Sequence, residues 1–215
     1  MSHSLNEIEA MSKRAARGAG LAWGLAEEAA KGTRWLSAFS FPGTEMLAGI
    51  LTLNDRLPAV DFSPATLNGQ WSAPAGRMSP LIAGAAMSDC AIRMEAGQVI
   101  EMENVSFPLL VVPFAGGAAL RLGVPVSVSW EGVKLTTDGQ RLCVQGERDA
   151  ILTTHATQLS CAAPAAMTGQ SEPVMRADVD EAAWEKLGEF AHRTYAPATE
   201  SSRLLGAGAG LSDND

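Results

Sequence analysis

The strongest constraint on the fold is a run of alternating apolar and polar residues over 126–145, interrupted at Glu131-Gly132 and Asp138-Gly139. Alternation of this kind is typical of half-buried strands, and pairs ending in glycine favour tight hairpin turns. The sequence therefore predicts an antiparallel three-stranded meander.

The register of this meander follows from the lengths of its turns. If both turns are two-residue loops, Val128, Leu135 and Leu142 lie opposite one another in one cross-strand row. The next row on that face holds Trp130, Val133 and Val144. The other face is expected to be largely wet and carries Ser127, Ser129, Lys134, Thr136 and Arg141. Further strands are predicted at 109–112, 151–154 and 157–161.

Helices are predicted on both sides of this β-rich region. Ser4-Leu5-Asn6-Glu7 has the form of a capping box and predicts a helix over 5–17. Gly18-Ala19-Gly20 ends it, and a second helix is predicted over 21–36, which makes a hairpin. Asp178-Val179-Asp180-Glu181 starts a third helix that ends near Tyr195, with an inner face formed by Trp184, Leu187 and Ala191.

These elements predict a single α+β domain over 1–215, in which an N-terminal helical hairpin and a C-terminal helix pack on a mainly antiparallel sheet. Its expected parts are the hairpin (1–40), a β-rich core (87–165), a helix (178–195), and a terminal arm and tail (196–215). Residues 41–86 are dense in proline and glycine, and no element is predicted there.

Charge and cysteine usage exclude several classes of protein. The net charge of -8 disfavours nucleic acid and anionic membranes as partners. The three scattered cysteines favour reduced thiols, and Glu7 and Glu9 stand where a signal peptide needs apolar residues. We therefore expect a cytoplasmic protein that does not span a membrane.

The sequence lacks the common motifs for metal binding, nucleotide binding and nucleophilic catalysis. It has no His/Cys cluster, P-loop or Gly-x-Ser-x-Gly elbow. The glycines at 18–24 lack the preceding strand and the third glycine of a dinucleotide fingerprint. We expect no cofactor. A glycine turn before a helix could still offer amides to an anion, or it could simply be a helix break.

Two residues are candidate catalytic groups. Glu28 is predicted to point inward, since it interrupts the apolar stripe of Leu21, Leu25, Gly32 and Trp35. In apolar surroundings it would be a general acid or base, whereas an arginine (Arg14, Arg17, Arg193 or Arg203) would make it half of a structural ion pair. His192 adjoins the polar terminal segment; the alternative is an exposed residue interacting with the helix dipole.

The segment 193–210 is the most distinctive part of the sequence. Its arginines, tyrosine and serine are predicted to bind a small anion together with residues near the other terminus: Arg17, Trp23, Arg193, Tyr195, Ser201 and Arg203. The alternative is a short capped helix from Thr199 to Arg203. We expect the two ends to meet, with Arg193 or Arg203 within ion-pair reach of Glu27 or Glu28.

Three segments, Arg17-Gly18-Ala19-Gly20, the run from Trp23 to Ala29, and 193–210, carry a resemblance to a family. They resemble a proteobacterial protein family catalogued as a domain of unknown function. The resemblance implies one domain over nearly the whole chain and a bacterial cytoplasmic origin. It implies no catalytic residue.

Two classes of function remain open at this point. The leading expectation is a cofactor-independent enzyme or binding protein for a small carboxylate or other anionic metabolite. The alternative is a non-catalytic assembly subunit that docks a partner protein through its terminal arm. A homo-oligomer is expected in either case, because a hairpin rich in alanine and glycine can pack closely against a copy of itself.

Overall fold

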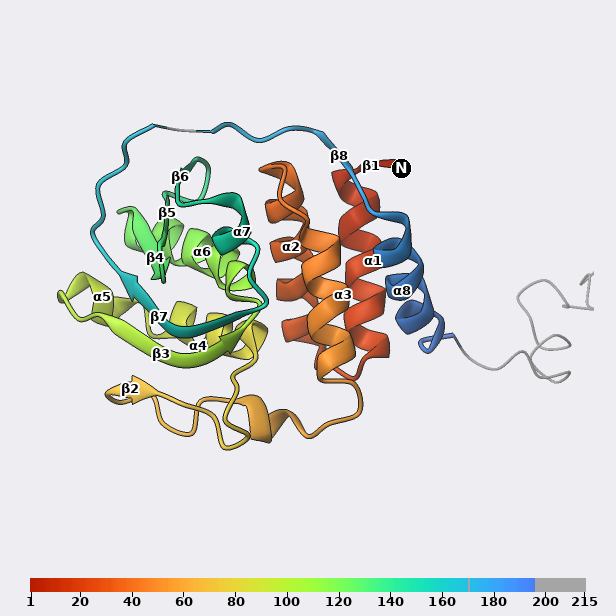
Figure 1. Cartoon of the computed structure of the whole chain (residues 1–215), viewed down its shortest axis with the longest axis horizontal. Coiled ribbons are helices and arrows are strands. Elements are labelled where there is room, and N and C mark those ends of the chain that lie inside the picture. The colour runs from red at the N-terminus through yellow and green to blue at the C-terminus, as the bar shows by residue number, and fades with distance from the viewer. Residues whose placement is uncertain (170, 196–215) are drawn as a thin grey trace, which may run out of the picture.

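The computed structural model describes residues 1–169 and 171–195, which form a layered α+β fold (Figure 1). One layer is a six-stranded sheet in the order β2-β3-β7-β4-β5-β6. Its strands are β2 (Gln70–Trp71), β3 (Ile100–Ser106), β4 (Val126–Trp130), β5 (Val133–Thr137), β6 (Leu142–Gln145) and β7 (His155–Ala162). Only β2 and β3 are parallel neighbours among these strands, so the predicted α+β class with a mainly antiparallel sheet is confirmed.

The helices α4 (Pro80–Asp89) and α6 (Val112–Leu122) pack on the apolar face of the sheet. The chain enters α6 through a short 3-10 helix, η2 (Pro108–Val111). Buried side chains of the sheet, such as Met102 and Val128, complete this part of the core. Three short elements link the larger ones: η1 (Ala59–Phe62), α5 (Ile92–Glu95) and α7 (Arg148–Ile151).

The remaining helices form a layer on the far side of α4 and α6 (Figure 1). They are α1 (Leu5–Gly18), α2 (Trp23–Ala38), α3 (Gly43–Leu53) and α8 (Glu181–His192). The small residues of α2 that the hairpin prediction emphasised, such as Ala26, Ala29 and Ala30, are buried within the chain itself. No helix in the described part of the chain is both long and apolar enough to cross a membrane.

The predicted capping box and hairpin turn are both confirmed. The Ser4 hydroxyl accepts the Glu7 amide (3.3 Å), and the Glu7 carboxylate accepts the Ser4 amide (2.8 Å). The amides of residues 19–21 donate to carbonyls of α1, and Gly20 takes a φ of 97°. The turn therefore uses its own amides internally, which favours the helix-break interpretation over an anion site.

The two ends of the described chain lie together beside α1, and most of the segment 193–210 that was predicted to contact the second helix lies outside the described residues. A two-stranded sheet pairs β1 (Ser2–Ser4) with β8 (Arg176–Asp178), and the Met1 amine donates to the Val179 carbonyl at 3.0 Å. His3 stacks on Trp184 of α8, with ring centroids 4.0 Å apart. The helix α8, which Asp180 caps, then lies along α1.

The predicted meander is present, and its first turn has the expected register. Val128 faces Leu135 across a two-residue loop. The second loop is longer, because the Asp138 carboxylate accepts the amides of Gln140 (3.0 Å) and Arg141 (2.7 Å). The prediction of two equal turns is therefore wrong for the second one.

The longer loop shifts the pairing of β6 by two residues. Leu135 faces Val144, and Leu142 faces Thr137, so the predicted row of Val128, Leu135 and Leu142 is wrong in its last member. A shift of two keeps each side chain on its face, and Leu142 remains buried.

The polar face of the meander is more buried than predicted. Ser127 and Thr136 are 6% and 3% exposed. The chain after β7 returns along this face, where the Cys143 thiol donates to the Gly169 carbonyl and the Ala165 amide donates to Pro125. Ser127 and Thr136 are therefore buried, whereas Lys134 and Arg141 remain exposed as predicted.

Two of the predicted strands are not strands: one is helical, and the other is the end of a helix followed by a turn. Residues 109–112 lie in η2 and the start of α6, and Ile151 ends α7. Pro108 and Pro113 favour the first turn of a helix and cannot donate to a strand ladder, so they explain the first error. The region 41–86, where no element was predicted, contains α3 and the start of α4.

The crossing of α1 and α8 yields a stability prediction. A Cβ atom on Gly18 would lie 1.7 Å from the Phe190 carbonyl oxygen, whereas one on Gly188 would meet nothing within 4 Å. Gly18→Ala should therefore destabilise the fold by about 1–3 kcal/mol in urea unfolding. The matched control Gly188→Ala should be neutral or stabilise by about 0.5–1 kcal/mol. Equal effects of both substitutions would contradict this packing.

The described cysteines give a second prediction. Cys90, Cys143 and Cys161 are free, as expected, and burial raises the pKa of Cys161 to about 12. In thiol titration all three should react after unfolding. In the native protein the half-buried Cys90 should react first and Cys161 last, because the thiolate is the reactive form. An intramolecular disulfide, or early labelling of Cys161, would contradict this order.

Candidate functional site

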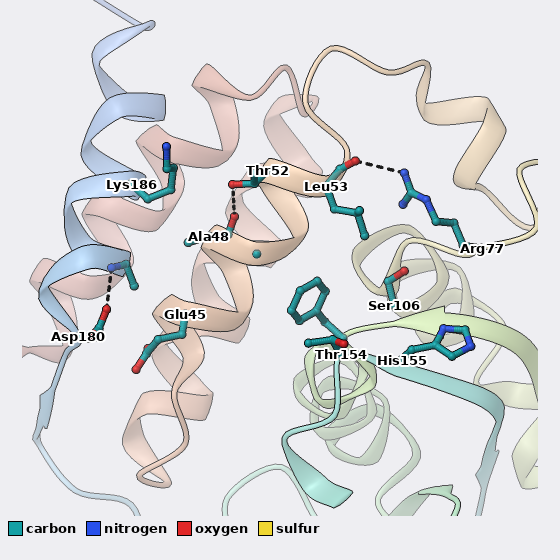
Figure 2. Close-up of a pocket in the computed structure, with 13 residues that line it drawn as sticks. Glu45, Ala48, Thr52, Leu53, Arg77, Ser106, Thr154, His155, Asp180 and Lys186 are labelled. Atoms are coloured by element: carbon teal, nitrogen blue, oxygen red, sulfur yellow. Dashed lines mark hydrogen bonds between the residues drawn. The ribbon is translucent and has the colours of Figure 1, made fainter. Parts of the chain in front are cut away.

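An open cleft of about 860 Å³ lies between the helices α3 and α8 and the end of the β3–β7 ladder (Figure 2). Five separate segments of the chain contribute its walls. The lining residues are Glu45, Ala48, Gly49, Thr52, Leu53, Arg77, Ser106, Phe107, Thr154, His155, Asp180, Ala183 and Lys186. Most of its surface is apolar, with polar groups at the ends, which is the usual character of a small-molecule site.

Phe107 lines the cleft and has a strained backbone conformation. Its φ and ψ are 47° and 60°, a left-handed backbone that bulky residues rarely adopt. The Phe107 amide donates to the Thr154 carbonyl at 2.8 Å, which anchors the turn to β7. Its ring packs on Gly49 so closely that a Cβ atom there would lie 2.5 Å from the ring. Gly49 is therefore required for the ring to lie between the helices and the sheet.

Arg77 lies at one end of the cleft with no ion pair among the described residues. Its guanidinium donates to the Asn54 side-chain oxygen (2.5 Å) and the Leu53 carbonyl (3.2 Å), both neutral, and stacks over Phe62 at 4.0 Å. Partial burial lowers the pKa of Arg77 from its ordinary value. Only two of its five N–H donors are used in these bonds. Arg77 therefore presents a positive charge that no described carboxylate neutralises.

Ser106 lies beside Arg77 in the cleft. The residue is only 3% exposed, and in the described part of the chain its hydroxyl has no hydrogen-bond partner. In Figure 2 the hydroxyl points toward the side of the cleft where Arg77 lies. His155 is the antiparallel neighbour of Ser106 on β7 and lines the same cleft. This end therefore combines a guanidinium, a hydroxyl and an imidazole.

The other end of the cleft is acidic. Glu45, in the first turn of α3, is half-buried and accepts a hydrogen bond from the Thr44 hydroxyl at 2.6 Å. Asp180 caps α8 by accepting the Ala183 amide at 2.9 Å. Lys186 is in an ion pair with Glu189 at 2.5 Å. The described residues contain no group of side chains that could hold a metal ion.

The predicted catalytic residues lie elsewhere. Glu28 is exposed, so its predicted inward orientation is wrong: the buried face of α2 is formed by small residues such as Ala29 and Thr33. Glu28 lines a separate groove of about 300 Å³ with Trp35 and Arg121. His192 is exposed on α8. Its ring lies edge-on to the Tyr195 ring, with ring centroids 5.6 Å apart.

The predicted ligand-binding residues of the described chain form two surface clusters. Arg17 stacks over the exposed Trp23 at 4.3 Å and donates to the Leu21 carbonyl. Tyr195 accepts a hydrogen bond from Arg14 at 3.0 Å, which joins the two helices α1 and α8. Neither cluster lines the cleft.

Arg193 and Glu27, which were predicted to form an ion pair between the two ends, each pair with another residue. Arg193 pairs with Asp55 at 2.6 Å, not with Glu27 or Glu28. Glu27 pairs with Lys13 of α1 at 2.5 Å. Ser201 and Arg203 lie outside the described residues, as does the rest of the predicted arm. The guanidinium of Arg193 holds the pKa of Asp55 below its ordinary value through a hydrogen bond.

Residues 3–79 match the model of a protein family described as a protein of unknown function (DUF3726). The resemblance to a family of unknown function is thereby confirmed over this segment. The match is shorter than expected and runs from β1 to the residue before α4. It includes Glu45 and Arg77 but not Ser106, Phe107 or His155. The comparison with curated proteins gave no match.

The exposure of Glu28 gives a third prediction. Glu28→Gln should change the free energy of unfolding by less than about 0.5 kcal/mol, because the side chain is exposed and away from buried networks. Urea unfolding at neutral pH is the measurement. A loss of several kcal/mol would restore the prediction of a buried, ion-paired carboxylate.

Proposed function

We propose that the protein binds a small carboxylate or similar anionic metabolite in the cleft, with Arg77 as the group that holds the anion. The main support is that the Arg77 guanidinium is half-buried and that all its partners among the described residues are neutral. A partly desolvated charge is costly unless an opposite charge approaches it. A ligand carboxylate would supply that charge.

The neighbours of Arg77 favour recognition of a planar anion. The guanidinium presents its donors in a rigid fork, which suits two parallel hydrogen bonds to a carboxylate. Asn54 and Phe62 hold this fork in place before any ligand arrives, so little conformational entropy is lost on binding. The unpaired Ser106 hydroxyl can donate a further hydrogen bond to the same ligand.

The proposal covers a binding protein and a cofactor-independent enzyme. The residue of the cleft best suited to proton transfer is His155, since histidine is the side chain most often used as a general acid or base. We therefore propose a function in the cleft rather than in the terminal segment that the sequence indicated.

Binding of caproate, a simple carboxylate with an apolar chain, tests the proposal. Isothermal calorimetry on the full chain should detect caproate binding that weakens about 10- to 100-fold in Arg77→Gln, since hydrogen bonds to charged groups contribute about 1.5–3 kcal/mol. Arg77→Lys should bind with intermediate affinity because it keeps the charge but loses the fork.

Arg93 provides a matched control. It also donates to a backbone carbonyl, that of Leu67, but lies outside the cleft. Arg93→Gln should leave caproate affinity unchanged. Melting temperatures without ligand verify that each variant is folded. Equal caproate affinity in Arg77→Gln and the unmodified protein would refute the proposal.

A further inference from the structure

The cleft has unneutralised charges of opposite sign at its two ends. Arg77 lies at one end with neutral partners only, among the residues described. Glu45 lies at the other end, half-buried, and its one described partner is the neutral Thr44 hydroxyl. Figure 2 shows these two side chains at opposite ends of the cleft, with Thr52 and Ser106 drawn between them.

The distance between the two ends follows from α3. Arg77 contacts the carbonyl of Leu53, at the end of the helix, and Glu45 is in its first turn. An α-helix rises about 1.5 Å per residue, so residues 45 and 53 are about 12 Å apart along the axis. A ligand that contacts a side chain near each of these positions therefore needs a longer spacer than an α-amino acid has.

The surface between the ends is apolar. Ala48, Gly49 and Ala183 line it together with the Phe107 ring. A methylene chain would lie against this surface and lose contact with water, which is favourable in proportion to the apolar area buried.

The other charged groups around Glu45 do not neutralise it. Lys186, on the facing helix α8, is in an ion pair with Glu189. Asp180 faces the same end and adds a second negative charge. The end of the cleft near Glu45 is therefore suited to a cation.

We infer that the ligand is zwitterionic, with a carboxylate held by Arg77 and Ser106, an ammonium group held by Glu45, and an apolar spacer between them. This inference rests on the proposed function, since it needs the anion at Arg77. It restricts the ligand class to ω-amino acids and compounds with the same arrangement of charges.

Three probes of similar length separate the two ends: caproate, hexylamine and ε-aminocaproate. Calorimetry on the full chain should show ε-aminocaproate binding at least tenfold more tightly than caproate, with hexylamine the weakest. β-Alanine, which is too short to reach both ends, should gain nothing over propionate. Glu45→Gln should abolish the advantage of ε-aminocaproate and leave caproate affinity unchanged.

Glu185, an exposed residue of α8 outside the cleft, gives the matched control, and Glu185→Gln should retain the full advantage. Equal affinities of caproate and ε-aminocaproate for the unmodified protein would overturn the inference and leave the proposed function standing. Equal weakening of both ligands by Glu45→Gln would also overturn it. Absence of binding by all three probes would overturn both.

Discussion

The contact between the Phe107 ring and Gly49 sets the spacing between the helical layer and the sheet. β3 ends at Ser106, and the left-handed turn at Phe107 both directs the chain into η2 and places the ring against α3. A side chain at residue 49 would push α3 away from the ring, and a different backbone at Phe107 would move the ring out of the seam. The cleft lies along this seam, with the Phe107 ring in its wall and charged side chains at its two ends.

The two charged ends of the cleft can exist without ligand because they are only half-buried. Complete burial of an unpaired charge would cost several kcal/mol, whereas a group that keeps part of its hydration loses less. Arg77 is further stabilised by the Phe62 ring, and Glu45 by the positive end of the α3 dipole. The site is therefore held ready by interactions that a ligand does not have to displace.

Short sequence motifs correctly predicted those features whose contacting residues are close together in the sequence. The capping box at Ser4 and the first turn of the meander are of this kind. Residues 109–112 were misread because a short buried apolar run has the same appearance in a strand and in a helix. No helix was predicted at α3, which begins after Pro42 without a side-chain cap. The cleft was missed because its residues are far apart in sequence: the Met78–Val105 bridge brings Arg77 to Ser106, and the β3–β7 ladder brings Ser106 to His155. Polar residues near the ends were conspicuous in sequence, yet Glu28 and His192 are simply exposed.

The pairing of β1 with β8 has a consequence for synthesis on the ribosome. Residues 2–4 can form their strand pairing only after residues 176–178 have been synthesised. The helix α8, which follows β8, supplies one wall of the cleft. A nascent chain emerging at about 5–20 residues per second therefore exposes the face of α1 that α8 covers for on the order of ten seconds. During that interval α1 presents alanines and Ile8 to the solvent. Among the described walls of the cleft, the one that α8 supplies is thus synthesised last.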